Sequence, residues 1–225
     1  IEKIQITKSI KSPQKSGEVG HSLIANLGWK FAERMLAQII SFIVSIILAR
    51  VLLPKDFGAI SMVMVFINIA DVFVTSSFSN ALIQKQNADN IDFSSVFFFN
   101  IGFSIVLYLI LYLCAPFVAS YYRIPILSTV LRVMGISVII AGANSVQQAY
   151  VSKHMMFKRF FWSTFYGTIL SGILGVIMAY RGFGVWALVV QNMLNSIVNT
   201  IVLWFTVRWR PIFRFSLSRI RSLLS

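Results

Sequence analysis

The chain has 225 residues and a net charge of +13, with 57% hydrophobic and only 12% charged residues. Soluble domains carry about 25% charged residues, so this composition excludes a globule with a water-exposed surface and indicates an integral membrane protein. The basic residues are spread through the short gaps between apolar runs, so no nucleic acid partner is expected. Residues 1–22 are polar and basic, and we expect them to form a cytoplasmic tail.

Six apolar stretches are long enough to span a membrane. A helix needs about 20 mostly apolar residues to cross about 30 Å of hydrocarbon, and these stretches lack the two-residue alternation of barrel strands. They are Leu23–Leu48, Phe57–Ile83, Phe93–Ser120, Ile126–Val151, Phe160–Tyr180 and Phe183–Val207. The predicted fold is therefore an all-α membrane protein with a six-helix transmembrane bundle at 23–207.

The gaps between the spans carry residues that start helices or make turns. Pro54 and Asp56 suit the first turn of the second helix, where a missing N–H and a negative charge are tolerated. Asp89 and Asp92 are suited to the same role before the third helix, and Gly182 suits a tight turn after the fifth.

The distribution of Lys and Arg among the gaps predicts the orientation. Cytoplasmic loops carry the excess of basic residues, so the richer side and both termini are expected to be cytoplasmic, in a multi-pass protein of the inner (cytoplasmic) cell membrane. The poorer side has Arg50, Lys55, Arg123 and Arg181. The richer side has Lys3, Lys8, Lys11, Lys15, Lys85, Lys153, Lys158, Arg159, Arg208, Arg210, Arg214, Arg219 and Arg221.

The segment 208–225 differs from the spans. Arg210, Arg214 and Arg221 recur near helical spacing, opposite apolar residues such as Phe213 and Leu217. This pattern predicts a basic amphipathic segment that lies on an anionic leaflet of the phospholipid bilayer, although a simple stop-transfer flank would have a similar composition.

Charged and polar residues within the spans are the main functional signal. Each intramembrane charge costs about 2.5–3.5 kcal/mol on insertion scales and usually faces a partner or a wet cavity. The first span holds Lys30, Glu33 and Arg34, the second holds Asp71 and the fourth holds Arg132. Uncharged polar residues extend these faces, and we expect the following to line a cavity: Gln38, Asn68, Asn195 and Asn199.

These residues predict a mainly cationic cavity lined by the first, second and sixth spans. Such a cavity suits an anionic substrate, because the planar guanidinium of Arg binds phosphate bidentately. Arg34 lies about 16 Å from the expected cytoplasmic start of its helix, so an ion pair with Asp71 near the midplane is geometrically possible. Alternatively, Glu33 neutralises Lys30 locally and the charges only hold helices together.

Other site chemistries lack the residues that they need. The single Cys114 lies in an apolar run, and the two histidines, His21 and His154, have no metal-ligand partners nearby in sequence. No phosphate-binding loop and no nucleophile–base pattern is present. We therefore expect no metal, no cofactor and no catalytic residue.

Two segments carry a resemblance to a known family. Residues 48–58, with the sequence LARVLLPKDFG, and residues 80–84, with the sequence NALIQ, resemble segments of bacterial polysaccharide flippases of the Wzx type. These flippases belong to the multidrug/oligosaccharidyl-lipid/polysaccharide exporter superfamily. The short basic stretches at 157–160 and 208–211 are similar to loops of the same family.

The resemblance implies that the chain is the N-terminal lobe of a two-lobe exporter, whose cavity is closed by a missing C-terminal lobe or a second copy. Residues 208–225 would then be the elbow between the lobes. The implied activity is transport of an isoprenoid-pyrophosphate-linked oligosaccharide by alternating access, for surface polysaccharide biosynthesis. Arg34, Lys30 and Arg132 would contact the pyrophosphate, and Asp71 would serve cation coupling or hold Arg34.

Three alternatives remain open at this level. A cation-coupled multidrug antiporter of the same superfamily needs acidic intramembrane residues, of which only Glu33 and Asp71 are present, against three bases. A membrane-embedded glycosyl- or acyltransferase needs a catalytic residue at the membrane surface, for which His154 is the sole candidate. A truncated protein without transport activity is the third.

Overall fold

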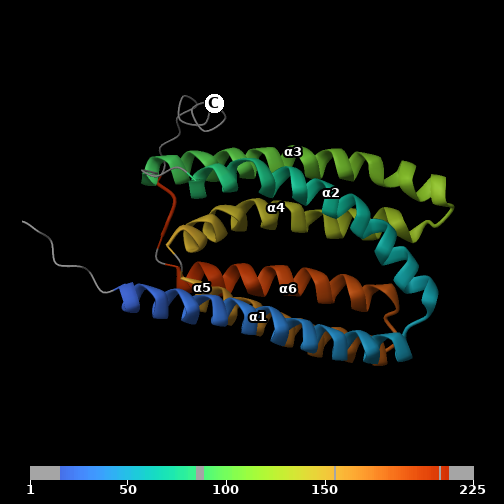
Figure 1. Cartoon of the computed structure of the whole chain (residues 1–225). Coiled ribbons are helices and arrows are strands. Elements are labelled where there is room, and N and C mark those ends of the chain that lie inside the picture. Colours follow the sequence, from blue (N-terminus) through green and yellow to red (C-terminus); the bar gives the residue numbers. More distant parts are fainter. Residues whose placement is uncertain (1–15, 85–88, 155, 208, 213–225) are drawn as a thin grey trace, which may run out of the picture.

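A computed structural model describes residues 16–84, 89–154, 156–207 and 209–212, which form an all-α bundle (Figure 1). The predicted all-α fold is confirmed, and each predicted span corresponds to one helix. The helices are α1 (Ser16–Val51), α2 (Pro54–Gln84), α3 (Asn90–Tyr122), α4 (Ile126–Lys153), α5 (Phe157–Tyr180) and α6 (Val185–Thr206). The start of α1 and the end of α6 lie at the same end of the bundle (Figure 1).

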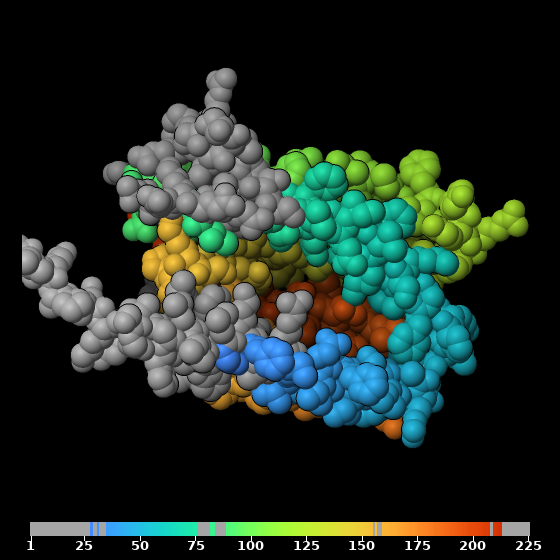
Figure 2. All heavy atoms as spheres, viewed as in Figure 1, coloured from blue at the N-terminus to red at the C-terminus, as the bar shows by residue number. Residues whose placement is uncertain are grey.

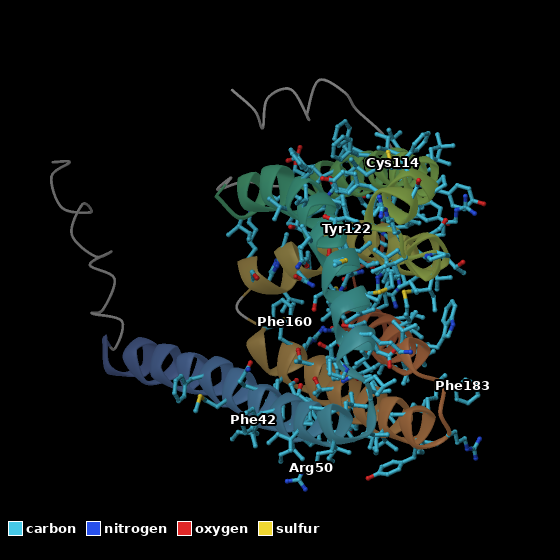
Figure 3. The ribbon with its side chains drawn as sticks, turned by 90° about the vertical axis from the view of Figure 1, so that its right-hand side faces the viewer. Phe42, Arg50, Cys114, Tyr122, Phe160 and Phe183 are labelled. Atoms are coloured by element: carbon cyan, nitrogen blue, oxygen red, sulfur yellow. The ribbon has the colours of Figure 1, made fainter. Side chains whose placement is uncertain are left out.

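The outside of the bundle is apolar on every helix. Phe42 of α1, for example, is 62% exposed, and Phe42, Cys114 and Phe183 lie on the outside of the bundle (Figure 3). Among the described residues, α2 to α6 each contain a stretch long and apolar enough to cross a membrane, and α1 has a shorter apolar stretch at Met35–Val51. A large exposed apolar surface of this kind is stable only when lipid replaces water as the solvent.

The helix ends follow the cap residues in the sequence. Pro54 begins α2, and the Leu53 N–H donates to Asp56 Oδ2 at 3.3 Å. A capping box joins Asp89 and Asp92 at the start of α3, where the Asp89 N–H donates to Asp92 Oδ2 at 3.1 Å. The sequence correctly indicated helix starts at these positions.

Two boundaries differ from the predictions. Helix α1 begins at Ser16, inside the stretch predicted as a polar tail, because Ser16 and Glu18 are residue types that favour a helix start even where the helix is too polar for lipid. Residues 209–212 are not helical. The rest of the predicted amphipathic segment, at 208 and 213–225, lies outside the described residues.

Close helix pairs meet at glycine residues. A Cβ atom at Gly142 of α4 would lie 2.6 Å from Ser104 Oγ of α3, and one at Gly172 of α5 would lie 2.7 Å from Val44 Cγ2 of α1. In lipid, apolar surface alone does not drive helices together, so small residues that allow close packing determine which helices pair. The α3–α4 and α5–α6 hairpins form two groups, with α2 packed on α4 and α1 packed on α5.

Helices α1 and α2 therefore belong to different groups, although they are consecutive in the chain. They are joined at residues 52–53 by a tight turn and then pack on α5 and α4 respectively. Between them the surface is hollowed, and atoms of α6 are visible at the floor of the hollow (Figure 2). The fold thus leaves one face of the bundle open between α1 and α2.

In contrast to this open face, the end of the bundle where α6 finishes is covered by a short segment. Val207 and Trp209–Ile212, here called the strap, leave α6 and pack across the ends of α3 and α4. The Trp209 side chain is only 6% exposed, and its ring lies 5.9 Å from the Phe93 ring and 6.0 Å from the Tyr150 ring. The Gln147 side chain donates to the Trp209 carbonyl at 3.3 Å, so aromatic packing and a hydrogen bond both hold the strap.

Basic side chains at this end bind the exposed carbonyls of helix termini. Lys153 of α4 donates to the Leu82 carbonyl near the end of α2 at 3.2 Å, and Arg159 of α5 donates to the Thr206 carbonyl at the end of α6. A cation at a helix C-terminus satisfies orphan carbonyls and interacts favourably with the helix dipole. These residues, counted above as setting the topology, therefore also connect helix ends.

The glycine contact between α3 and α4 can be tested by adding one carbon. Gly142→Ala should lower the free energy of unfolding by about 1–3 kcal/mol, because the new Cβ has to displace Ser104. The measurement is the melting temperature of the purified protein in detergent, followed by circular dichroism. Gly102→Ala in α3 is the matched control, since its Cβ would meet nothing within 4 Å. Equal melting temperatures for the two variants would contradict the close approach.

Candidate functional site: a polar pocket between three helices

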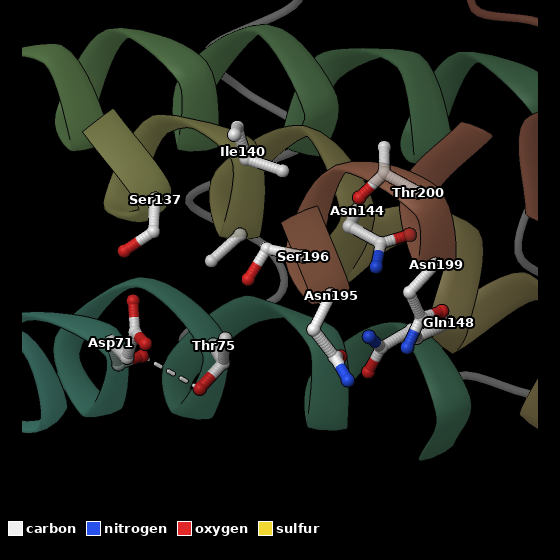
Figure 4. A pocket seen from close by; sticks show the side chains of 11 residues that line it. Asp71, Thr75, Ser137, Ile140, Asn144, Gln148, Asn195, Ser196, Asn199 and Thr200 are labelled. Atoms are coloured by element: carbon white, nitrogen blue, oxygen red, sulfur yellow. Dashed lines mark hydrogen bonds between the residues drawn. The ribbon is translucent and has the colours of Figure 1, made fainter. Parts of the chain in front are cut away.

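A polar pocket of about 170 Å³ lies between α2, α4 and α6 (Figure 4). A second pocket of about 150 Å³ adjoins it and shares Asp71, Ser137 and Ser196 with it. Asp71 and Thr75 come from α2, and most of the remaining lining is amide and hydroxyl side chains. Those from α4 and α6 are Ser137, Asn144, Gln148, Asn195, Ser196, Asn199 and Thr200.

Helical periodicity brings these side chains to one place. Ser137, Ala141, Asn144 and Gln148 recur every three or four residues and so occupy one face of α4. The same spacing places Asn195 and Asn199 on one face of α6. Asp71 lies near the middle of α2, so the pocket is near mid-depth in the bundle. Three apolar spans thus each contribute one polar stripe to a common cavity.

Several pocket oxygens are buried without a hydrogen-bond donor. Among the described residues, Asp71 Oδ1, Asn144 Oδ1 and Asn199 Oδ1 are buried acceptors with no partner, and Thr200 Oγ1 is also unpartnered. Burying an unpaired polar group costs about 1–3 kcal/mol, so such groups are rare away from binding sites. The pocket wall therefore contains buried acceptor oxygens that a ligand with hydrogen-bond donors could satisfy after small side-chain movements.

Other pocket groups are already paired. The Thr75 hydroxyl donates to the Asp71 carbonyl at 2.7 Å, and the Ser137 hydroxyl donates to the Met134 carbonyl at 2.6 Å. The Asn195 amide donates to Ser171 Oγ of α5 at 3.3 Å, which connects the pocket wall to the α5–α6 hairpin. These bonds orient part of the pocket wall, while the buried acceptor oxygens named above have no partner.

The structure places the sequence candidates in three groups. Asp71, Asn195 and Asn199 line the larger pocket, and Asp71 and Asn68 line the smaller one. Gln38 of α1 is exposed and lines neither pocket. The side chains of Lys30, Glu33 and Arg34 lie outside the described part of the chain, although all three positions are within α1.

Arg132 is set apart from the pocket. Its guanidinium carbon lies 4.5 Å from the centre of the Tyr112 ring of α3, in a cation–π contact, and its Nε is buried without a partner. It lines neither pocket. Met134 is the nearest residue in sequence that lines a pocket, and Ser137 is the first residue of the α4 polar stripe. Arg132 therefore faces α3 and not α2 and α6.

The polar stripe of α4 was missed in the sequence analysis. Ser137, Asn144 and Gln148 recur at helical spacing within the fourth span and form an uncharged polar stripe like that of the sixth span. The signal that finds them is the same periodicity that identified Asn195 and Asn199. Among the described residues, no three His, Cys, Asp or Glu side chains are grouped to hold a metal ion.

Comparison with known proteins identifies the family. The family described as polysaccharide biosynthesis protein matches residues 47–225, which is most of the chain. The chain belongs to this family. Its similarity extends to flippases of the Wzx type, and it is a multi-pass membrane protein related to polysaccharide transporters. No solved structure matches it.

Relatives from three bacteria support this relationship. The chain is 25% identical to the succinoglycan biosynthesis transport protein ExoT of Rhizobium meliloti, over 88% of the chain and 40% of ExoT. It is 25% identical to the teichuronic acid biosynthesis protein TuaB of Bacillus subtilis, over 69% of the chain and 33% of TuaB. It is 19% identical to the lipopolysaccharide biosynthesis protein WzxC of Escherichia coli, over 77% of the chain and 36% of WzxC. The chain thus spans well under half of the length of these relatives.

The unpaired pocket oxygens give a prediction about stability. Thr200→Val should leave the melting temperature unchanged or raise it, because the Thr200 hydroxyl is buried without a partner. Thr206→Val in the same helix is the matched control. It should lower the free energy of unfolding by about 0.5–1.5 kcal/mol, because the Thr206 hydroxyl donates to the Val202 carbonyl at 2.6 Å. Thermal unfolding in detergent distinguishes the two, and an equal loss in both would show that Thr200 is already paired.

Proposed function

We propose that the chain is the N-terminal lobe of a flippase that moves an isoprenoid-pyrophosphate-linked oligosaccharide across the cell membrane by alternating access. The observation that carries the proposal is a polar pocket in the middle of an otherwise apolar bundle, beside a face that is open between α1 and α2. Burying so many polar groups in lipid is costly, and such groups usually mark a transport pathway. The family of the chain supports a saccharide-related substrate.

The open face supports the proposal that a second lobe completes the pathway. Each lobe of an alternating-access transporter needs a surface that opens and closes against its partner. We assign this role to the hollow between α1 and α2 (Figure 2). The matched region covers 40% of the length of ExoT. A protein of that length could therefore contain a second helical unit of similar size. A C-terminal lobe or a second copy of the chain would cover this face.

Arg34 and Lys30 are the residues that we propose for the pyrophosphate. Arg34 and Asp71 are each 17 residues from the α1–α2 turn, at Val51 and Pro54 respectively, and so lie at a similar depth of roughly 26 Å along their helices. Because α1 and α2 border the hollow on opposite sides, a phosphate at Arg34 would lie across from Asp71. Arg132 packs on Tyr112 and is not needed in this arrangement.

Asp71 is then proposed as the coupling residue or as the partner that holds Arg34 between transport cycles, and Glu33 as the local partner of Lys30. A carboxylate in a pocket of neutral oxygens can alternate between a cation and an arginine. This role does not require a catalytic step, in agreement with the transport function in the name of ExoT.

The function is tested by removing the gene and restoring it. Deletion should abolish the surface polysaccharide and leave its lipid-linked precursor in the cytoplasmic leaflet, and the unchanged gene should restore the polysaccharide. Arg34→Ala should fail to restore it at normal expression, because the phosphate would lose its bidentate partner. Arg50→Ala is the matched control, since Arg50 is exposed in the last turn of the same helix and points away from the bundle (Figure 3).

Two results would contradict the proposal at different levels. Normal polysaccharide after deletion would contradict the flippase function, whereas full restoration by Arg34→Ala would contradict only the role of Arg34. Export of fluorescent cationic drugs, without any effect on polysaccharide, would favour a multidrug antiporter.

The orientation is proposed from the distribution of basic residues, with both termini in the cytoplasm. In a Cys114→Ala background, His154→Cys should react with a membrane-impermeant maleimide only after the membrane is opened, because the α4–α5 turn faces the cytoplasm. Arg123→Cys, in the α3–α4 turn, should react in intact cells. Both positions are exposed, so access depends on the side of the membrane and not on burial. The reverse pattern would invert the topology.

A further inference from the structure

The pocket between α2, α4 and α6 differs in charge from the cationic cavity expected from the sequence. Among the described residues that line it, Asp71 is the single charged side chain, and no Lys or Arg is present. Acceptor oxygens from all three helices are buried without donors: Asp71 Oδ1, Asn144 Oδ1 and Asn199 Oδ1. A phosphate group brings only acceptors and negative charge, so it cannot pair with these buried oxygens, and the Asp71 carboxylate would repel it.

The pocket oxygens are also too widely spread for one metal cation. Ser137 and Gln148, both on α4 and both lining the pocket, are 11 residues apart, or roughly 16 Å along the helix. Asp71 and Ser137 lie toward one end of the pocket, and Asn144, Asn199 and Gln148 lie toward the other (Figure 4). A cation binds oxygens at about 2.3–2.6 Å, so one ion would satisfy one end and leave the other unpaired.

An elongated ligand with several hydroxyl groups fits both observations. Each hydroxyl offers one donor, and donors spaced along an oligosaccharide of more than one sugar can reach acceptors at both ends of the pocket. Asn144 is the strongest single indicator: it is 6% exposed, lines the pocket, and has a buried Oδ1 without a partner. Amide side chains also donate, so they can pair with ring and hydroxyl oxygens of the same ligand.

We propose that this pocket is the saccharide subsite, which binds sugar hydroxyl groups of the lipid-linked substrate and not its pyrophosphate. This inference rests on the proposed function and refines it. The saccharide is bound by neutral amides and Asp71 between α2, α4 and α6, and the pyrophosphate is bound elsewhere, by the basic positions of α1. Selectivity for the sugar then depends on Asn144 and Asn199.

The experiment measures binding of two probes to the full chain in lipid nanodiscs. The two lipid probes are an isoprenyl pyrophosphate without sugar and the same lipid carrying an oligosaccharide. Binding of the free oligosaccharide is measured as well. Asn144→Leu and Asn199→Leu should weaken binding of the sugar-bearing lipid by roughly three- to tenfold each and leave the sugar-free lipid unchanged. Gln191→Leu is the matched control, since Gln191 is on α6 beside Gly175 and outside both pockets.

Each other outcome overturns the inference in a recognisable way. Equal binding of both lipids, unaffected by the two variants, would leave the flippase function intact and exclude a saccharide subsite here. Equal weakening of both lipids would place the phosphate in this pocket. Because Asp71 is already proposed for cation coupling, sodium-dependent affinity that Asp71→Asn removes would assign the pocket to a cation alone only if Asn144→Leu and Asn199→Leu leave binding of the sugar-bearing lipid unchanged. If the unchanged protein binds neither lipid nor free oligosaccharide, both this inference and the proposed function fail.

Discussion

The close approach of paired helices at glycine is the constraint on which the rest of the structure depends. Gly142 against Ser104 brings α4 against α3, and Gly172 against Val44 brings α5 against α1. Lipid tails are as apolar as leucine side chains, so leucine-rich surfaces give little reason for one pairing over another. Glycine allows backbones to approach and so selects the pairs. Because α1 packs on α5 and α2 packs on α4, the bundle stays open between α1 and α2.

The polar pocket is stable only because these pairings isolate it. Asn195 is held by Ser171 of α5, and Asp71 is on a helix that packs against α4. The side chains on the outside of the bundle are mainly apolar, so the free-energy cost of placing polar groups within the membrane arises mainly at the pocket. The acceptor oxygens without donors are then a local loss of stability that a bound ligand would recover. Binding sites often trade stability for function in this way.

Much of the fold could be predicted from the sequence, because six long apolar runs and their cap residues are local signals. The start of α1 could not, since a helix that continues beyond the membrane loses its apolar pattern. In the pocket, the stripe of Asn195 and Asn199 was readable from helical spacing, as was the mid-membrane charge of Asp71. The direction that Arg132 faces was not readable, because it depends on how α4 is rotated against α3, which a single-helix pattern does not contain. The α4 amides, Asn144 and Gln148, recur at the same helical spacing and could have been predicted in the same way.

The strap has a mechanical consequence. Trp209 is wedged against Phe93 of α3 and Tyr150 of α4, and the Ile212 N–H donates to Ser94 Oγ at 2.9 Å. A force applied to the chain beyond Ile212 therefore acts on the α3–α4 hairpin through these contacts as well as on α6 through the covalent chain. The pocket amides of α4 lie on the same helix as Tyr150, so the strap contacts directly a helix that forms part of the pocket wall.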